Sequence, residues 1–244
     1  MWTLKKGSVL RVRYVIKFTK ESSIKFISHL DLMRTIQRVI RRANLPMEYS
    51  KGFNPHMALS IAQPLSVGVY SDSEYMDIVL VEELEEQEII DKLNSKTASG
   101  IKFLNARKII TKEGEKKLPQ TMALVDAARF TIKMICTDSK IVENKMEELI
   151  SKTEWTTIKK SKKGEKEVNL KTMIKEMKYW INDDELVLKV LISSGSREHL
   201  SPDLLAEYIK SNICEIVEDS FIDMKREEMY VLKDDKYIPI YKCI

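Results

Sequence analysis

The stretch VRYVIKFTKESSIKFISHLDLMRTIQRVIRRA, residues 12–43, holds the two patterns from which the fold is predicted. Apolar and polar side chains alternate over residues 12–18, which is typical of a half-buried strand. Ser28 then suits a helix N-cap, with Asp31 placed favourably in the first helical turn. Apolar residues follow at three- and four-residue spacing, so a helix is expected over about 29–43.

Four more elements are expected before the end of the first half. They are an apolar stretch at 58–62, a strand at 74–80, an acidic helix at 82–94 and a strand at 101–109. The resulting order, strand–helix–strand–strand–helix–strand, is that of the ferredoxin-like arrangement. Its antiparallel sheet carries helices on one face and leaves the other face free for a ligand or a second domain.

The same order is expected again in the second half of the chain. The predicted elements are a strand at 128–136, a helix at 140–151, a short strand at 155–158, a strand at 186–192, a helix at 201–212 and a final strand at 213–224. An insertion near 159–181 has no assigned place in this order. The repeat is visible in the order of the elements and not in residue identity.

The sequence therefore predicts an α+β protein made of two ferredoxin-like (βαββαβ) units, antiparallel sheets with helices on one face. Gly114 and Pro119 mark a linker between them. Residues 1–110 would form a basic ferredoxin-like domain, residues 111–124 the linker, and residues 125–244 a second ferredoxin-like domain with the insertion.

Composition excludes several classes of protein. Of the 244 residues, 43% are hydrophobic and 32% are charged, which is typical of a globular chain and not of a disordered one. No run of about 18 apolar residues could span a membrane, and the first residues do not resemble a signal peptide. The 3 cysteines lie far apart, which excludes a disulfide framework or a zinc knuckle and suits a reducing cytoplasm. We expect a cytoplasmic protein with no bound metal or cofactor and no membrane partner.

The charge is distributed unevenly along the chain. Residues 1–60 hold 12 Lys and Arg against 3 Asp and Glu, whereas residues 61–100 hold 2 against 9. A basic surface of this kind commonly binds a polyanion such as a nucleic acid. The alternative is a solvated basic surface with no partner.

Three arginines mark a possible contact with a phosphate backbone. Arg34, Arg38 and Arg41 stand at positions i, i+4 and i+7, which places them on one face of the predicted helix. Arginine side chains bind phosphate oxygens in pairs, so this stripe could follow an RNA backbone. The alternative is an exposed helix face that only keeps the protein soluble.

The turn that follows the helix combines residues typical of single-stranded RNA binders. The segment YSKGFNPH, residues 49–56, supplies Lys51 for a phosphate, Phe53 for stacking on a base and His56 for a base edge. The alternative is a structural turn in which Phe53 fills the core and His56 lies on the surface.

Histidines raise the possibility of acid–base catalysis. His29 and His56, with Asp31, would act together only if the turns at 28–31 and 52–56 met at one edge of the sheet. No cysteine or further histidine has metal-ligand spacing to either histidine. No residue is therefore assigned firmly to catalysis, and these three remain the weak candidates.

Several segments of the first half resemble one bacterial family. KFISHLDLMR (25–34), LP (45–46), SKGFNPH (50–56), PLSVG (64–68) and SEYMD (73–77) are similar to the radical-SAM-linked, or radical-SAM-associated, proteins. That family is a domain of unknown function found beside, or fused behind, B12-binding-type radical SAM enzymes. The resemblance implies a radical SAM enzyme as partner. The chain lacks the C-x-x-x-C-x-x-C motif that would hold the cluster of such an enzyme.

Three function hypotheses follow. The leading one is a non-catalytic RNA-binding accessory protein that works with a radical SAM enzyme in tRNA or rRNA modification. A second is an RNA-processing or RNA-modifying enzyme that uses His29 and His56 for acid–base chemistry. The third is a protein-interaction module for a radical SAM enzyme, without RNA binding, in which the acidic helix at 82–94 docks the partner.

Overall fold

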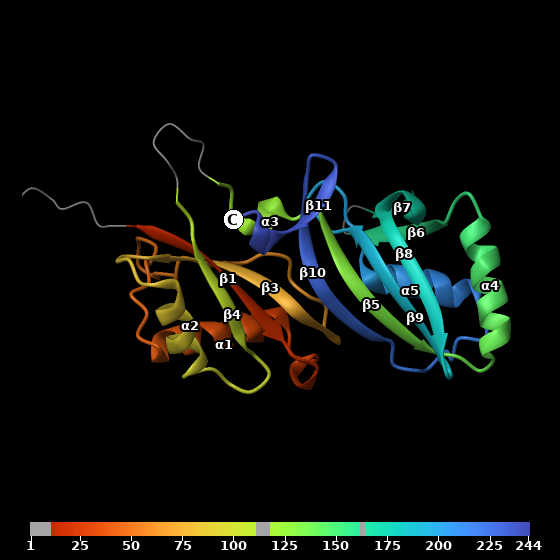
Figure 1. The fold of residues 1–244 in the computed structure, drawn as a ribbon, viewed down its shortest axis with the longest axis horizontal. Helices are drawn as coiled ribbons and strands as arrows, with labels where there is room; N and C mark the ends of the chain where they lie inside the picture. The colour runs from red at the N-terminus through yellow and green to blue at the C-terminus, as the bar shows by residue number, and fades with distance from the viewer. Residues whose placement is uncertain (1–10, 111–117, 162–163) are drawn as a thin grey trace, which may run out of the picture.

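The computed structural model describes residues 11–110, 118–161 and 164–244 (Figure 1). Nine strands form one sheet in the order β4-β1-β3-β10-β5-β9-β8, with β2 beside β3 and β11 beside β10, and β6 pairs only with β7. The strands are β1 (Val12–Lys20), β2 (Leu59–Ile61), β3 (Val69–Leu80), β4 (Phe103–Lys108), β5 (Ala127–Ile135), β6 (Thr156–Ser161), β7 (Gly164–Asn169), β8 (Ile174–Asn182), β9 (Glu185–Ser193), β10 (Asp223–Lys233) and β11 (Lys236–Pro239). The helices are α1 (His29–Arg42), α2 (Glu86–Asn94), α3 (Thr121–Leu124), α4 (Ser139–Ser151) and α5 (Pro202–Asn212), with 3-10 turns η1 (Ser22–Ile24), η2 (Leu170–Met173) and η3 (Ile240–Lys242). The predicted α+β class is confirmed.

The first half, called unit 1, runs from β1 to β4 in the order β-α-β-β-α-β. Its strands lie in the order β4-β1-β3, with the short β2 paired to β3, and all these pairs are antiparallel. Helix α1 begins where predicted, because the Ser28 hydroxyl accepts a hydrogen bond from the Asp31 amide at 3.2 Å. Its apolar stripe, with Leu32, Ile36 and Val39, is buried against the sheet.

The second half, called unit 2, runs from β5 to β10 and has the strand order β10-β5-β9-β8. The second strand and the last strand of this unit differ from their predicted positions. The second strand of this unit is β8, within the predicted insertion, whereas the short strand expected at 155–158 belongs to the separate β6–β7 hairpin. Trp155 comes directly before this hairpin and is fully buried, with its ring stacked on Tyr208. It therefore anchors the segment to α5 and does not belong to a strand of the large sheet.

The last strand is also displaced from its predicted position. We expected it at 213–224, but β10 covers Asp223–Lys233. Ile213 and Ile216 are buried from a loop, where their three-residue spacing does not fit the alternation of a strand. β10 was overlooked because it carries five charged residues within its first six positions, Asp223, Lys225, Arg226, Glu227 and Glu228.

A parallel pair of strands joins the two units into one sheet. Met224, Lys225 and Arg226 of β10 pair with Val69, Tyr70 and Ser71 of β3. In Figure 1 these strands lie side by side at the middle of the molecule, with unit 1 on one side and unit 2 on the other. This pairing was not predicted, because two separate sheets were expected.

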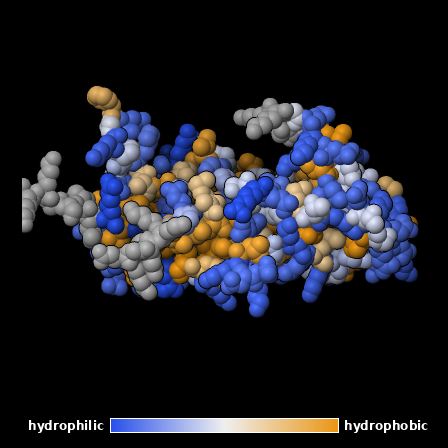
Figure 2. All heavy atoms as spheres, turned by 90° about the horizontal axis from the view of Figure 1, so that it is seen from above, coloured by the Kyte–Doolittle hydropathy of each residue, from blue (hydrophilic) through white to orange (hydrophobic). Residues whose placement is uncertain are grey.

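Each unit has its own core, with helices packed on one face of its part of the sheet. The core of unit 1 lies between β1, β3, β4 and the helices α1 and α2. The core of unit 2 lies against α4 and α5 and also includes Val15, Val69 and Tyr75 from unit 1. Figure 2 shows apolar side chains gathered around the middle of the long axis, with mostly hydrophilic residues at the end of unit 2. No helix within the described ranges is both long and apolar enough to cross a membrane.

Candidate nucleic-acid interface

Helix α1 presents its arginines to solvent. Arg34, Arg38, Arg41 and Arg42 are all exposed, whereas the opposite side of the helix is buried. Arg34 forms an ion pair with Asp31 at 3.1 Å. Within the described parts of the chain, Arg38 and Arg41 form no ion pair, so their guanidinium groups are available to an anion. The predicted arginine stripe is therefore present as an exposed surface feature.

Asp31 has a local role at the start of this helix. Its carboxylate accepts a hydrogen bond from the Ser28 hydroxyl at 2.8 Å and one from Arg34 at 3.1 Å. These two hydrogen bonds, from Ser28 first and then from Arg34, hold the pKa of Asp31 below its usual value. A carboxylate that stays ionised and pairs with its own helix is suited to capping and not to proton transfer near neutral pH.

The loop 50–56 forms a closed turn with its aromatic residue outside. The Ser50 amide donates to the His56 carbonyl at 2.8 Å, and the His56 amide donates to the Ser50 hydroxyl at 2.9 Å. Gly52 has a φ of +121° and faces open space. Phe53 at the tip is fully exposed, at 111% of its reference area. The alternative in which Phe53 fills the core is wrong.

The loop 50–56 lies at the same end of unit 1 as the C-terminal turn of α1. The Glu48 amide donates to the Val79 carbonyl at 2.8 Å, and Met47 bridges to Leu80, so the base of the loop is fixed to the end of β3. These contacts follow directly after α1, whose last turn carries Arg41 and Arg42. Lys51, Phe53 and His56 are exposed at this end of unit 1.

His29 lies at the opposite end of unit 1. It begins α1, just after Lys25, whose carbonyl accepts a hydrogen bond from the Gly68 amide at 2.9 Å at the start of β3. The 14 residues of α1 extend about 21 Å at 1.5 Å per residue. The 12 residues of β3 separate its two ends by roughly 36 Å. The turns at 28–31 and 52–56 therefore do not meet, and the juxtaposition that acid–base catalysis by His29 and His56 requires is absent.

The described residues show no group of three or more His, Cys, Asp or Glu side chains that could hold a metal ion. Cys136, Cys214 and Cys243 are all free thiols, and burial raises the pKa of Cys136. Neither histidine of the candidate interface belongs to such a group.

Residues 13–202 match the family described as an uncharacterized protein conserved in bacteria, DUF2344. The match spans both units as far as the start of α5. The chain belongs to this family.

Curated proteins and solved structures add no information on function. No curated protein matches the DUF2344 chain. Two similar solved structures are an unknown protein from Galdieria sulphuraria and a putative glycine cleavage system transcriptional repressor. The first has 10% identity over 91% of this chain and 100% of that chain, with a TM-score of 0.26. The second has 8% identity over 89% and 99%, with a TM-score of 0.22. At these TM-scores neither likeness supports a statement about fold or function.

A buried polar cluster, missed at the level of sequence, ties the units of this DUF2344 protein together. The carboxylate of Glu228 accepts hydrogen bonds from the Tyr75 hydroxyl and from Lys17, both at 2.7 Å, and from the Ser73 hydroxyl at 2.5 Å. Burial and the charge of Glu228 raise the pKa of Tyr75 far above its usual value. Because these hydrogen bonds saturate the carboxylate within the fold, the cluster serves the junction between β3 and β10.

A second carboxylate, Asp77 of β3, holds the start of α3, the short helix that precedes unit 2. It accepts hydrogen bonds from Arg13 and from the Thr121 amide, both at 2.8 Å. Arg13 also donates to the carbonyls of Leu118 and Pro119 at 2.5 and 2.6 Å. The sequence signal for both sites was the run SDSEYMD at 71–77, which overlaps the strand predicted at 74–80 and supplies Asp77 and the Ser73 and Tyr75 partners of Glu228.

Proposed function

We propose that this protein is a non-catalytic RNA-binding accessory protein. One observation carries the proposal: a fully exposed Phe53 projects from the same end of unit 1 as exposed cationic side chains of α1. A solvent-exposed phenylalanine contributes nothing to the core, so its position fits contact with a partner. An exposed ring together with exposed cations at one end of a unit is the combination that single-stranded RNA binders use.

Each residue of this interface has a chemical part in the proposal. Arg38 and Arg41 bind phosphate oxygens, and Lys51 adds a point charge within the loop 50–56. Phe53 stacks on an unpaired base, because every base offers an aromatic face. His56 contributes a hydrogen bond to the base edge. Arg34, which Asp31 holds at 3.1 Å, is a weaker phosphate ligand until that ion pair opens.

The chemical reaction is assigned to a partner. The resemblance of residues 25–77 to radical-SAM-linked proteins supports a radical SAM enzyme in this role, with tRNA or rRNA as the RNA. The protein would hold the RNA while the enzyme modifies it. The separation of His29 from His56 gives no support to the alternative of an enzyme active on its own.

The acidic helix α2 offers little for docking. Glu88 pairs with Lys92 at 2.7 Å, Glu86 lies 3.7 Å from Arg107, and Glu83 pairs with Lys108. These three carboxylates are neutralised within unit 1, which leaves fewer charges at 82–94 for a partner.

Equilibrium binding tests the proposal. Fluorescently labelled bulk tRNA and an rRNA fragment are titrated with the purified chain, with its Arg38→Gln/Arg41→Gln variant and with a control, Lys140→Gln/Lys178→Gln. The control removes two exposed lysines of unit 2 and the same total charge. We expect the arginine variant to weaken binding at least about tenfold, as the loss of two phosphate contacts implies, and the control to change it less than twofold. Equal weakening by both variants would mean that only net charge matters.

A further inference from the structure

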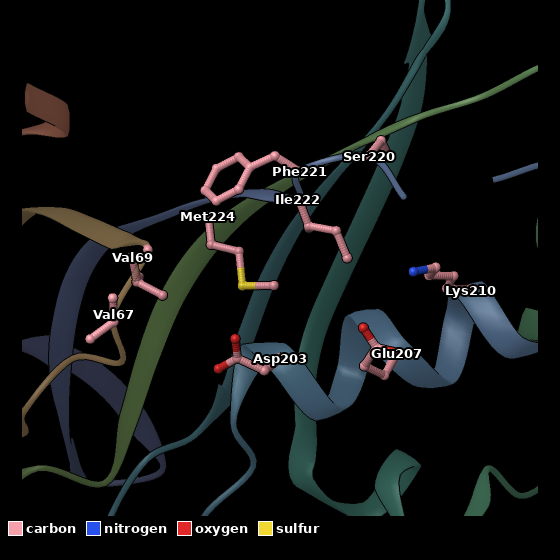
Figure 3. A pocket seen from close by; sticks show the side chains of 10 residues that line it. Val67, Val69, Asp203, Glu207, Lys210, Ser220, Phe221, Ile222 and Met224 are labelled. Carbon is pink, nitrogen blue, oxygen red and sulfur yellow. The ribbon is translucent and has the colours of Figure 1, made fainter. Parts of the chain in front are cut away.

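An open cavity of about 250 Å³ lies where the two units meet (Figure 3). One side is formed by α5 and the other by the start of β3 and the segment that leads into β10. Its lining residues are Val67, Gly68, Val69, Asp203, Glu207, Lys210, Ser220, Phe221, Ile222 and Met224. None of these residues belongs to the RNA interface proposed above.

The two walls of the cavity differ in chemistry. Figure 3 shows the side chains of Asp203 and Glu207 on the α5 side, facing an apolar wall that includes Ile222 and Met224. Asp203 and Glu207 are one helical turn apart, and neither forms an ion pair with any described residue. Lys210 donates to the Glu218 carbonyl at 2.5 Å, so its ammonium is directed toward that backbone oxygen.

The cavity continues along α5 as a second hollow of about 310 Å³. Its lining residues are Glu207, Lys210, Ser211, Cys214, Ile216 and Glu218. The two hollows share Glu207 and Lys210, and together we call them the α5 groove. The groove carries three carboxylates against one ammonium, so its net charge is negative. The 11 residues of α5 extend about 16 Å, the length of three helical turns.

Exposed apolar side chains form the rim of the α5 groove. The rings of Phe26 and Phe221 meet edge to face with their centroids 5.6 Å apart, although 63% and 49% of these residues are exposed. Val67 is 58% exposed. Gly68, with a φ of +92°, lies beneath both rings, and a Cβ there would be 3.7 Å from Phe221 and 3.9 Å from Phe26. Neighbouring exposed apolar groups of this kind mark an interaction surface.

We infer that the α5 groove docks a basic, amphipathic helical segment of a partner protein. Apolar side chains of such a segment pack against Phe221 and Met224, and its lysines or arginines pair with Asp203 and Glu207. An RNA is a poor occupant, because its phosphates would face three carboxylates. A second copy is a poor occupant as well, because its basic helix α1 has its apolar side buried in the core. The inference goes beyond the proposed RNA binding and does not depend on it.

Peptide binding tests this inference on the full chain. The probe is a labelled 14-residue peptide of leucine and lysine in helical spacing, and the reference peptide replaces lysine by glutamate. We expect one lysine peptide per chain and no binding of the glutamate peptide. The Asp203→Asn/Glu207→Gln variant and, separately, Phe221→Ser should each weaken binding at least tenfold.

A matched control keeps the test specific. Glu143 and Glu147 on α4 are exposed and have the same i, i+4 spacing, so Glu143→Gln/Glu147→Gln should change peptide affinity less than twofold. The inference is overturned if the lysine peptide does not bind, if this control weakens binding as much as the groove variants, or if the groove variants weaken tRNA binding. Peptide binding without any RNA binding would support the groove while contradicting the proposed function.

Discussion

Arg226 of β10 and Glu74 of β3 form an ion pair at the junction of the two units, and both side chains are almost fully buried, at 2% and 1% exposure. Arg226 Nε donates to Glu74 Oε1 at 2.9 Å, and Arg226 Nη2 reaches both carboxylate oxygens. Nη2 also donates to the Gln63 carbonyl at 2.7 Å. The pair lies where β3 and β10 run parallel, so it joins the two halves of the sheet.

Removing one partner of this ion pair should strongly lower the stability of the fold. Glu74→Gln leaves the Arg226 guanidinium buried without a counter-charge, and we expect the free energy of unfolding in urea to fall by about 3–5 kcal/mol. The double change Glu74→Met/Arg226→Met should lower the free energy of unfolding less than either single change, because neither charge of the pair stays buried without the other. Lys92→Gln, which opens an exposed pair on α2, should cost less than about 1 kcal/mol. A loss below that value for Glu74→Gln would show that the junction does not depend on the pair.

Stability at alkaline pH should depend on Tyr70. Its hydroxyl donates to Asp223 at 2.9 Å, and burial, followed by this hydrogen bond and the charge of Asp223, raises its pKa to about 12. An unfolded tyrosine titrates near pH 10, so the fold favours the protonated form. The stabilisation is complete below about pH 10 and is lost as the pH rises toward 12.

Urea unfolding at a series of pH values from 9 to 12 measures this effect. Tyr70→Phe has no proton to lose, so its stability should fall less steeply than that of the wild type across this window. Parallel curves for the two proteins would contradict the assignment of the pKa shift to Tyr70.

The sequence predicted the parts of this protein whose patterns are local. The apolar stripe of α1 and the cap at Ser28 defined a helix, and the order of elements indicated an α+β fold. The β3–β10 pair could not be predicted in this way, because its partners are more than 150 residues apart and its strands are rich in charged residues. The buried role of Arg226 depends on Glu74, which lies on another strand.

The candidate interface, too, was predicted only in part. The exposure of Arg38 and Arg41 follows from helical spacing, which the sequence carries. The position of Phe53 depends on how the loop 50–56 is fixed to Val79, so core and surface remained equal alternatives. The distance between His29 and His56 depends on the lengths of α1 and β3 together, and only the three-dimensional arrangement reveals it.

Cleavage between the units should leave them associated. A protease site inserted between Ile110 and Leu118 allows the chain to be cut there. Because Arg226–Glu74, Lys17–Glu228 and the β3–β10 pairing all cross the junction, the two fragments should elute together in gel filtration and unfold in one transition. Two separately eluting folded fragments would instead support independent domains with limits at 110 and 125.

Phe53→Ala should lower RNA affinity and leave the stability of the fold nearly unchanged. The side chain is exposed, so the melting temperature should stay within about 1 °C of the wild type, in contrast to the 3–5 kcal/mol lost with a buried phenylalanine. RNA affinity should fall by about 1–3 kcal/mol, the value of one base stack. His56→Gln should have a small effect, because glutamine keeps a donor and an acceptor. Unchanged affinity for Phe53→Ala would remove Phe53 from the interface.

The salt dependence of tRNA affinity shows whether this protein binds RNA through phosphate contacts of α1. The logarithm of the association constant is measured against the logarithm of the salt concentration for the wild type and for Arg38→Gln/Arg41→Gln. RNA binding through phosphates predicts a steep negative slope in the wild type, and each phosphate contact removed should make it shallower by about 0.7–0.9. If the wild type does not bind tRNA, or if the slope of the variant equals that of the wild type, α1 does not bind RNA phosphates.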